Sequence, residues 1–186
     1  MTRLILIRHG ETDWNREGRY TGQTDIPLND VGLRQARNLA ERLREELLDA
    51  LYSSDLARAT MTSRLVSEVT GTKVRLDTRL REINQGEWEG LPFNEIRNRY
   101  RRILDLRKKE PLSAAPPGGE TIGEVQSRVL DSLEDILGNY PHRTVAIVSH
   151  GLPLAIIKTH FNDLPIEAIW DHIPENAVPF VIDAES

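Results

Sequence analysis

The chain alternates between short apolar runs and longer segments in which apolar and polar residues are mixed. Two of the apolar runs, residues 4–7 and 145–148, are aliphatic, and a histidine-glycine pair follows closely after each of them. A continuous aliphatic run of this length, bounded by polar residues and glycine, is typical of a parallel strand that is buried on both faces. The pattern therefore predicts that both runs are inner strands of one sheet.

Two further strands and a first helix are predicted from the segments between these runs. Residues 50–53 form a short apolar strand, and residues 73–76 alternate polar with apolar side chains, as an outer strand does. A polar loop over residues 11–27 precedes a helix that opens at residues 28–30. Apolar residues recur along this helix at spacings of three and four, which places one stripe against a sheet. The stripe consists of Leu33, Ala36, Ala40, Leu43 and Leu47.

Capping residues and periodicity indicate more helices. Residues 56–69 form a helix with Ser54 or Asp55 as its N-cap and Gly71 at its end. Another helix is predicted where apolar side chains recur at Phe93, Ile96, Tyr100 and Ile103.

The last third of the chain continues the same alternation. Residues 111–119 contain three prolines and two glycines and are expected to form a mobile loop. Residues 121–124 form a capping box that starts a long helix, and Pro153 fits the first turn of a last helix. Strands that alternate with amphipathic helices predict an α/β fold, a three-layer sandwich with a mostly parallel central sheet and helices on both faces. We expect a single domain over residues 1–186.

The composition restricts the classes of function. The chain has 186 residues, of which 24 are basic and 29 acidic, so that its formal net charge is −5. This balance argues against a general binder of nucleic acid or of acidic membranes. The absence of cysteine excludes disulfides, thiolate metal sites and a cysteine nucleophile. Because the first apolar run is too short for a signal peptide or a membrane span, we expect a cytoplasmic enzyme, with a homodimer left open.

The two histidines that follow the aliphatic strands are the first candidates for chemistry. Ligands of open α/β sheets bind beyond the carboxyl ends of the strands, so His9 and His150 are expected to face one crevice. Arg8 adds a guanidinium group, which can bind phosphate oxygens in a bidentate way. An imidazole can attack phosphorus or hydrogen-bond the group that is transferred. The expected ligand is therefore an anion such as a phosphate group.

Two other parts of a phosphoryl-transfer site have candidates in the sequence. Arg58 lies near the start of its predicted helix, where the helix N-terminus also favours an anion. The transfer further needs a proton source for the leaving oxygen. The acidic segment around Trp88 offers Glu82, Glu87 and Glu89, and their spacing alone does not choose among them.

Four segments together resemble the histidine phosphatase superfamily, also called the phosphoglycerate-mutase-like superfamily. They are Arg-His-Gly-Glu-Thr-Asp-Trp-Asn at residues 8–15, Ser-Ser-Asp-Leu-Ala-Arg-Ala at 53–59, Glu82 with Gly-Glu-Trp-Glu-Gly at 86–90, and Ser-His-Gly at 149–151. They occur in the order that the superfamily has, and they span most of the chain. The resemblance implies an enzyme that works through a phosphohistidine intermediate.

The resemblance also implies roles for individual residues. His9 would be phosphorylated, Glu82 would be the proton donor, and no metal or other cofactor is implied. Arg8, Arg58 and His150 would line the phosphate pocket with His9. The substrate-binding residues suggested by the resemblance are Asn15, Thr21, Gly22, Gln23 and Gly151.

Two departures from the mutases of this superfamily favour a phosphatase. Mutases follow the acid with a sequence of the Arg-His-Tyr-Gly type and are longer, whereas here Ile83, Asn84 and Gln85 follow the acid and the sequence ends at Ser186. The Gly-Glu-Trp-Glu-Gly stretch and the length are similar to α-ribazole phosphatases and to small broad-specificity phosphatases, although Gln85 stands where an aromatic residue is frequent. We therefore expect hydrolysis of small phosphorylated metabolites.

Two alternatives compete with this hypothesis. Within the superfamily, the chain could be a phosphoglycerate mutase or a sugar-bisphosphatase. Outside catalysis, the same pocket could serve a module that binds phosphate or a phosphoprotein. The presence of both His9 and Glu82 disfavours the module, because binding alone needs neither a nucleophile nor an acid.

A basic segment and three further histidines have less specific interpretations. The segment is either a solvated helix face or, together with residues 111–119, a cap over the crevice that steers an anionic substrate. Nucleic acid is a poor third interpretation, because base stacking needs several aromatic side chains and Tyr100 stands alone. His142, His160 and His172 are expected to be surface or capping groups. The basic residues are Arg97, Arg99, Arg101, Arg102, Arg107, Lys108 and Lys109.

Overall fold

In the computed structural model, which describes residues 1–185, five strands form one sheet in the order β3-β2-β4-β1-β5. They are β1 (Thr2–Arg8), β2 (Ala50–Ser53), β3 (Val74–Leu76), β4 (Thr144–Ser149) and β5 (Phe180–Ala184). The first four are parallel to their neighbours, and β5 pairs antiparallel with β1. The predicted inner strands β1 and β4 are adjacent, and β3 is an edge strand as expected. The antiparallel edge strand β5 was not among the predicted elements.

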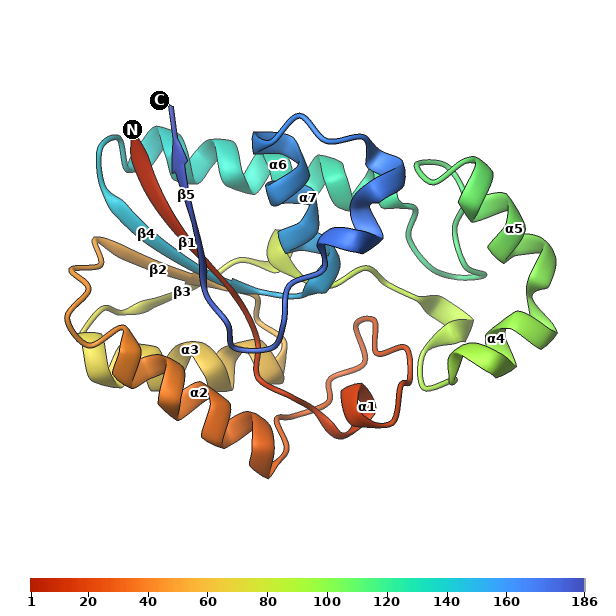
Figure 1. Ribbon diagram of the computed structural model, residues 1–186, viewed down its shortest axis with the longest axis horizontal. Helices are drawn as coiled ribbons and strands as arrows, with labels where there is room; N and C mark the ends of the chain where they lie inside the picture. The colour runs from red at the N-terminus through yellow and green to blue at the C-terminus, as the bar shows by residue number, and fades with distance from the viewer. Residues whose placement is uncertain (186) are drawn as a thin grey trace.

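Two pairs of helices cover the two faces of the sheet (Figure 1). Leu4 and Leu6 of β1 point into a core shared with α6 (Ile122–Asn139) and α7 (Gly151–Phe161). Ile5 and Ile7 point into the opposite core, shared with α2 (Asp30–Arg42) and α3 (Ala57–Thr70). Because side chains of a strand alternate between the faces, an all-aliphatic strand is what a sheet covered on both sides requires. The three-layer α/β prediction is confirmed.

The remaining elements gather beyond the carboxyl ends of the inner strands. Helices α4 and α5 extend to the right of the sheet in Figure 1, and α1 lies to their lower left. No helix within residues 1–185 is long and apolar enough to cross a membrane. The elements are α1 (Asp13–Arg16), η1 (Thr78–Leu80), η2 (Gly86–Trp88), α4 (Phe93–Arg99), α5 (Arg101–Lys109) and η3 (Ile166–His172), the η elements being 3₁₀ helices.

Most helix ends follow the predicted capping residues, but the start of α3 does not. The helix begins at Ala57, and neither Ser54 nor Asp55 is its N-cap. Asp55 instead accepts a hydrogen bond of 2.7 Å from Nε of Arg81. The N–H of Ala57 donates to Oδ1 of Asp25 at 2.6 Å. The expectation was wrong because the capping carboxylate comes from a loop that is distant in sequence.

The single helix expected around Tyr100 is two helices. Tyr100 has a non-helical backbone (φ −127°, ψ 28°) and separates α4 from α5. Its hydroxyl donates to Oε2 of Glu87 at 2.9 Å, and its ring lies 6.1 Å from that of Trp88, so contacts with η2 hold the chain at this bend. The predicted apolar stripe is therefore interrupted: Phe93 is 48% exposed, whereas Arg107 is buried.

One smaller expectation also differs from the structure, and the loop predicted over residues 111–119 is present. Helix α2 ends at Arg42, and Leu47 is 88% exposed, because the chain leaves helical geometry at Leu43 and turns towards β2. The C-terminal part of the loop over residues 111–119 is hydrogen-bonded to the acidic segment around Trp88. The N–H of Glu87 donates to the carbonyl of Pro117 at 3.0 Å.

Candidate active site

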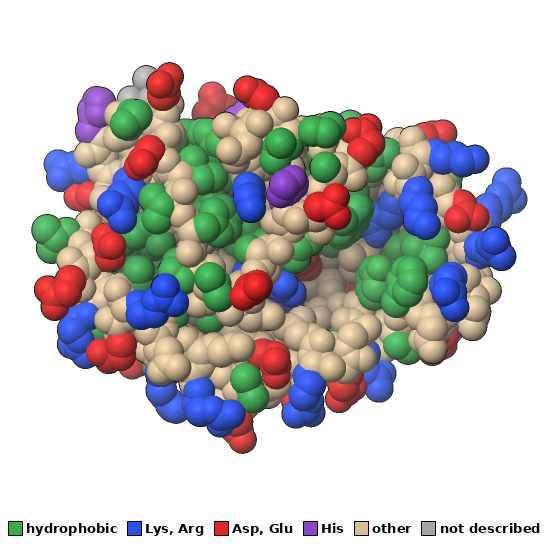
Figure 2. All heavy atoms as spheres, viewed as in Figure 1, with side chains coloured by type: hydrophobic (Ala, Val, Ile, Leu, Met, Phe, Trp, Pro, Cys, Tyr) green, Lys and Arg blue, Asp and Glu red, His purple; other side chains and the backbone are tan. Residues whose placement is uncertain are grey.

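A cavity of about 350 Å³ lies beyond the carboxyl ends of β1 and β4. Figure 2 shows this face of the molecule hollowed between the sheet and the α4–α5 segment. We call this the phosphate cavity. Two of the residues expected at the site, His150 and Gln23, are not part of its wall. The expected residues that do line it are Arg8, His9, Asn15, Thr21, Gly22, Arg58, Glu82 and Gly151.

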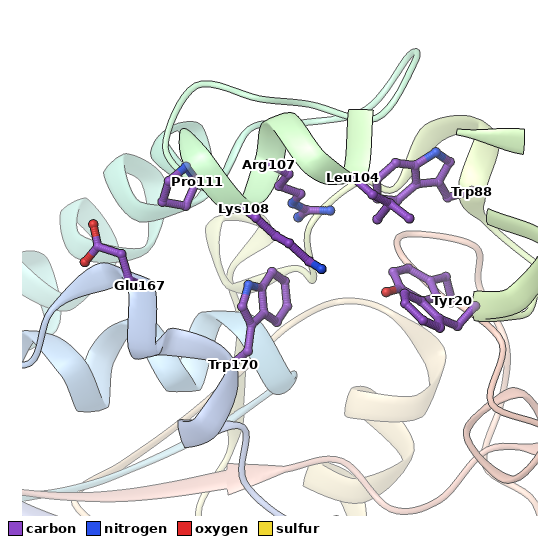
Figure 3. A pocket seen from close by; sticks show the side chains of 9 residues that line it. Tyr20, Trp88, Leu104, Arg107, Lys108, Pro111, Glu167 and Trp170 are labelled. Atoms are coloured by element: carbon purple, nitrogen blue, oxygen red, sulfur yellow. The ribbon is translucent and has the colours of Figure 1, made fainter. Parts of the chain in front are cut away.

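Sequence reasoning missed several other wall residues. Arg19 and Tyr20 come from the loop after α1, and Trp170 comes from η3. Figure 3 shows Tyr20 and Trp170 on opposite sides of the opening that leads towards α5. No local pattern marks these residues, because tertiary packing of distant segments brings them to the cavity. Ile83, Gln85, Leu152 and Ile173 complete the wall.

His9 is held in one orientation at the floor of the phosphate cavity. It follows β1 directly, its backbone N–H donates to the carbonyl of Ser149 at 3.1 Å, and only 3% of the residue is exposed. Its Nδ1 lies 2.7 Å from the carbonyl oxygen of Gly10. A carbonyl can only accept, so Nδ1 carries the hydrogen and Nε2 keeps its lone pair in the neutral ring. The arrangement leaves a nucleophilic nitrogen free.

The surroundings of His9 keep its ring neutral. Burial lowers the pKa of His9 well below its usual value, and the positive charges of Arg58 and Arg8 lower the pKa further. Burial also lowers the pKa of Arg58 to about 10, so that its guanidinium group is still charged at neutral pH. The site therefore combines an uncharged imidazole with fixed positive charges.

His150 lies next to His9 and accepts a hydrogen bond from Arg58. The centroids of the two imidazole rings are 5.1 Å apart, and His150 is fully buried. Its Nδ1 accepts a hydrogen bond of 3.2 Å from Nε of Arg58, and its Nε2 lies 2.8 Å from the hydroxyl of Ser54. Since a guanidinium group only donates, Nε2 carries the hydrogen of the neutral ring. Burial lowers the pKa of His150 well below its usual value, and Arg58 adds to this effect.

The two arginines at the cavity differ in how they are held. Arg58 uses all three nitrogens: besides the bond to the histidine ring, Nη1 donates to the carbonyl of Thr24 at 3.0 Å and Nη2 to that of Gly22 at 2.7 Å. Arg8 donates from Nη1 to the carbonyl of Pro174 at 2.9 Å. Its Nε is buried and has no acceptor within residues 1–185. Such an orphaned donor costs about 1–3 kcal/mol, which an anionic ligand would offset.

The structure distinguishes the three candidate carboxyl groups that the spacing left open. Glu82 lines the phosphate cavity, and its Oε1 accepts a hydrogen bond of 2.9 Å from the N–H of Ile83. Glu87 is exposed and binds the hydroxyl of Tyr100. Glu89 is occupied by other groups of the protein, because it accepts bonds from the backbone N–H groups of Gln23, Thr24 and Gln85 and from the hydroxyl of Thr24. Of the three carboxyl groups, Glu82 is the one that lines the phosphate cavity.

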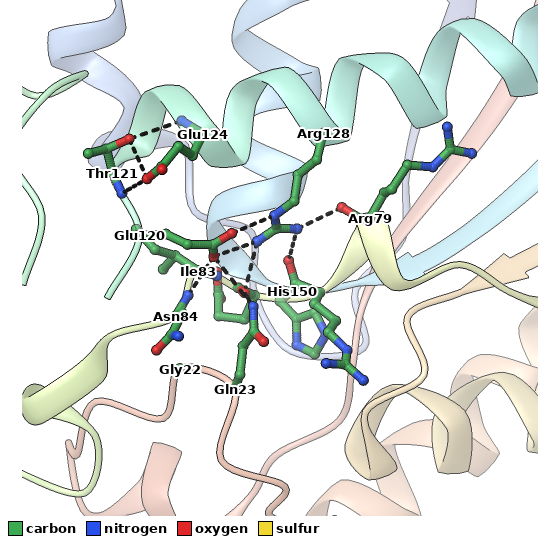
Figure 4. A network of polar contacts seen from close by, with 12 residues as sticks. Gly22, Gln23, Arg79, Ile83, Asn84, Glu120, Thr121, Glu124, Arg128 and His150 are labelled. Atoms are coloured by element: carbon green, nitrogen blue, oxygen red, sulfur yellow. Dashed lines mark hydrogen bonds and ion pairs between the residues drawn. The ribbon is translucent and has the colours of Figure 1, made fainter. Parts of the chain in front are cut away.

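A polar network centred on Arg128 of α6 holds the acidic segment in place (Figure 4). Nη1 of Arg128 donates to the carbonyls of Arg79 at 2.7 Å and Arg81 at 2.6 Å, and its Nη2 donates to the carbonyl of Glu82 at 3.0 Å. Nε2 of Gln23 donates to the same Glu82 carbonyl at 3.1 Å. The resemblance suggested that Gln23 binds substrate at the cavity. In the structure, Gln23 instead donates a hydrogen bond to the backbone of Glu82 and does not line the cavity.

The short helix α1 contributes the polar side chain of Asn15 to the wall of the phosphate cavity. Thr12 and Asn15 form a reciprocal capping box in which Oδ1 of Asn15 accepts from the Thr12 N–H at 3.2 Å. Because the amide oxygen is used in this bond, the Nδ2 group of Asn15 is left as a donor at the cavity. Within residues 1–185, no group of three or more histidine, aspartate or glutamate side chains is arranged to hold a metal ion.

The chain matches the family model of the histidine phosphatase superfamily, branch 1, over residues 4–185, and it belongs to this superfamily. It is 34% identical over 185 residues to phosphoserine phosphatase 1 of Hydrogenobacter thermophilus, covering 100% of this chain and 88% of the relative. The sequence-based prediction of a phosphatase of this superfamily is thereby confirmed.

Solved structures of other phosphatases superpose closely. The mycobacterial glucosyl-3-phosphoglycerate phosphatase is 32% identical with a TM-score of 0.88, covering 99% of this chain and 92% of that one. The α-ribazole phosphatase from Shigella flexneri is 28% identical with a TM-score of 0.89, covering 98% of this chain and 91% of that one. The α/β architecture described above is therefore that of solved phosphatases.

Proposed function

We propose that the protein hydrolyses small phosphate monoesters through a phosphohistidine formed on His9. The observation that carries the proposal is the state of the His9 ring, which is neutral, fixed through Nδ1 and free at Nε2. Two guanidinium groups, those of Arg8 and Arg58, lie at the same cavity. An oriented nucleophile beside fixed positive charge is the arrangement that transfer of an anionic phosphoryl group needs.

In the first half of the reaction, Nε2 of His9 attacks the phosphorus atom and the bond between phosphorus and the ester oxygen breaks. The protonated carboxyl group of Glu82 donates its proton to the leaving oxygen, so that a neutral alcohol departs. The ring now carries a positive charge, which the bond from Nδ1–H to the carbonyl of Gly10 stabilises. Arg8 and Arg58 stabilise the negative charge on the phosphoryl oxygens.

In the second half, water attacks the phosphorus atom and the bond from phosphorus to Nε2 breaks. The carboxylate of Glu82 accepts the proton that the water loses. His9 returns to its neutral form, and inorganic phosphate leaves. Arg58 needs no movement for either step, because Thr24, Gly22 and His150 hold its three nitrogens throughout.

The substrate class follows from the cavity and from the named relatives. A cavity of about 350 Å³ has room for a phosphate group and a small part of an alcohol. The relatives' names specify phosphoserine, glucosyl-3-phosphoglycerate and α-ribazole compounds as substrates, all of them small molecules. We propose a small phosphorylated metabolite as the substrate of this chain as well.

The proposal is tested by trapping the intermediate. The protein is mixed with a ³²P-labelled ester, quenched in alkaline detergent and digested, and the label should be acid-labile, stable in alkali and located on the peptide that contains His9. His9→Ala should lose both label and turnover while its circular dichroism stays unchanged. The matched control is His160→Ala, because His160 is exposed. Full turnover by His9→Ala, or label on another residue, would contradict the mechanism.

A further inference from the structure

Two polar side chains that do not line the phosphate cavity contact the backbone beside the nucleophile. They are Gln35 of α2 and Thr62 of α3, two helices that lie side by side on one face of the sheet (Figure 1). Their side chains accept hydrogen bonds from the peptide groups on either side of Gly10, the residue that follows His9. The mechanism above assigns no role to either residue.

The peptide group between His9 and Gly10 is hydrogen-bonded at both ends. Its N–H donates to Oγ1 of Thr62 at 3.1 Å, and its carbonyl accepts from Nδ2 of Asn176 at 2.8 Å. Thr62 is fully buried and donates its own hydroxyl hydrogen to the carbonyl of Arg58 at 2.9 Å. Because a hydroxyl group has only one hydrogen, Oγ1 meets Gly10 as an acceptor. Thr62 therefore connects the backbone beside the nucleophile to the helix that carries Arg58.

The next peptide group, between Gly10 and Glu11, carries the carbonyl that accepts the hydrogen bond from Nδ1 of His9 at 2.7 Å. The N–H of the same peptide group donates to Oε1 of Gln35 at 2.8 Å. A peptide group bonded at both ends cannot rotate without breaking one of the bonds, and each bond polarises the group in favour of the other. Gln35 therefore orients and strengthens the acceptor that decides which ring nitrogen of His9 carries the hydrogen.

The packing of two glycines brings Gln35 within reach of this peptide group. A Cβ atom on Gly10 would lie 2.5 Å from the carbonyl oxygen of Gly32, and one on Gly32 would lie 2.1 Å from that of Glu11. Gly32 is in the first turn of α2, and Gln35 follows three residues later on the same side of the helix. The backbone after β1 therefore rests directly on α2, with the Gln35 side chain against it.

We propose that Gln35 and Thr62 are positioning residues that keep the hydrogen of the neutral His9 ring on Nδ1 and the lone pair on Nε2. This inference rests on the proposed function, because that function uses Nε2 as the nucleophile. Without the oxygen of Gln35, the N–H of Glu11 would lose its acceptor, and the peptide group would turn to find another. The carbonyl of Gly10 would then leave Nδ1, and nothing would hold the hydrogen on that side of the ring.

NMR of protein that carries ¹⁵N in its histidine rings measures where the hydrogen is, without any substrate. Protonated and unprotonated nitrogens of a neutral imidazole resonate in separate regions, and the signals of His9 are those that His9→Asn removes. At pH 7 the wild-type His9 should show a protonated Nδ1 and an unprotonated Nε2. In Gln35→Met and in Thr62→Val, both signals should move towards intermediate positions, because the ring then exchanges between its two tautomers.

Conservative variants and matched controls show whether the hydrogen bonds themselves are responsible. Gln35→Glu keeps an acceptor oxygen and Thr62→Ser keeps the hydroxyl group, so both should retain the wild-type His9 signals. Thr60→Val is the control on α3, since the Thr60 hydroxyl bonds within its own helix. Gln126→Met makes the glutamine substitution on α6, outside the phosphate cavity. Neither control should change the signals of His9.

The kinetic effect of Gln35→Met should differ from that of losing the proton donor. Every ester uses the same nucleophile, so kcat/KM should fall by a similar factor, about 10–100, for p-nitrophenyl phosphate and for an alkyl phosphate. Inorganic phosphate should inhibit the variant at least as strongly as the wild type, because the hydrogen bonds of Arg8 and Arg58 are not altered. A general disruption of the site would weaken this inhibition.

Thermal unfolding checks that each variant folds. If Thr62→Val does not fold, the Gln35 variants decide the question, since Gln35 is only half-buried.

The outcomes separate this inference from the proposed function. Wild-type His9 signals in Gln35→Met and Thr62→Val would overturn the positioning role and leave the phosphatase function intact. A fall in kcat/KM without any change in the His9 signals would overturn it equally. If the wild-type protein hydrolysed no ester, the phosphatase function itself would be refuted, and the NMR signals would still decide whether Gln35 and Thr62 fix the ring.

Discussion

Gly22 and Glu89 are packed so closely that a side chain at position 22 would have to displace the Glu89 carboxylate. A Cβ atom there would lie 2.1 Å from Oε1 of Glu89, and the φ angle of Gly22 is +57°, in the left-handed region. The carbonyl of Gly22 accepts the bond from Nη2 of Arg58. Gly22 therefore contacts both the Glu89 carboxylate, which accepts hydrogen bonds from the loop, and the Arg58 guanidinium group at the phosphate cavity.

Gly22→Ala should therefore lower both stability and activity. The left-handed backbone costs an alanine about 1 kcal/mol, and the contact with Glu89 adds to this cost and shifts the carbonyl that holds Arg58. We expect kcat/KM for p-nitrophenyl phosphate to fall at least about tenfold. Gly18→Ala is the matched control, since Gly18 has φ +67° and open space around it. Equal effects of the two substitutions would show that the contact with Glu89 is unimportant.

Glu89→Gln should destabilise the loop over residues 22–24 although the glutamine side chain has the same shape as the glutamate side chain. One carboxylate oxygen becomes an NH₂ group, which cannot accept the backbone N–H bonds that Glu89 now receives. We expect a loss of about 2 kcal/mol in the free energy of unfolding, measured with urea. Glu87→Gln, at an exposed carboxyl group, should change it by less than about 0.5 kcal/mol. A similar small effect at both positions would refute this structural role of Glu89.

Glu82→Gln should slow the reaction in a way that depends on the leaving group. Alkyl phosphates need protonation of the departing oxygen, whereas p-nitrophenolate leaves readily without it. We expect kcat/KM to fall about 10²–10⁴-fold for an alkyl ester and clearly less for p-nitrophenyl phosphate. A comparison of kcat/KM for both esters, with Glu87→Gln as control, measures this difference. Equal losses would argue that Glu82 is not the proton donor.

The buried histidines should make the protein less stable in mild acid. The folded-state pKa values of His9 and His150 lie well below the usual value of 6.5, which applies in the unfolded chain. As the pH falls below about 6.5, the unfolded state therefore binds more protons than the folded state. The free energy of unfolding should decrease by up to about 1.4 kcal/mol per pH unit for each histidine.

Urea titrations between pH 7 and pH 5.5 check this expectation. His9→Asn removes one of the two buried groups and should reduce the slope of stability against pH by about half. His160→Asn, at an exposed position, should leave the slope unchanged. A wild-type stability that is constant over this range would contradict the neutral, buried state of both rings.

The sheet and its two histidines could be predicted because they depend on local patterns. Residues 4–7 and 145–148 are aliphatic on both faces, which a doubly covered parallel strand requires, and the residues that follow such strands reach the ligand-binding edge. The edge strand β5 was missed, because it pairs antiparallel with β1 on the outside of the sheet and shows no such run. Its residues alternate between half-buried and exposed positions over most of its length, whereas the inner strands are buried almost continuously.

The parts of the site that could not be predicted depend on contacts between distant segments. The basic stretch around Arg107 is typical of a solvated helix face. In the structure, however, Arg107 is buried because Trp88 and Trp170 enclose it. Glu82 could not be distinguished from Glu89 by spacing, since the distinction lies in which backbone N–H groups each carboxylate accepts. The structural roles of such residues are set by the fold as a whole.

The adjacency of β1 and β4 also has a consequence for the order in which activity appears during synthesis. Arg8 pairs with Ser149 in the sheet, so His9, which follows β1, has its supporting strand in β4, far away in the sequence. A ribosome must therefore make the chain through β4 before His9 acquires its surroundings. Contacts so distant in sequence also form slowly. The nascent protein should stay unable to cleave phosphate esters until β4 has left the ribosome and paired with β1.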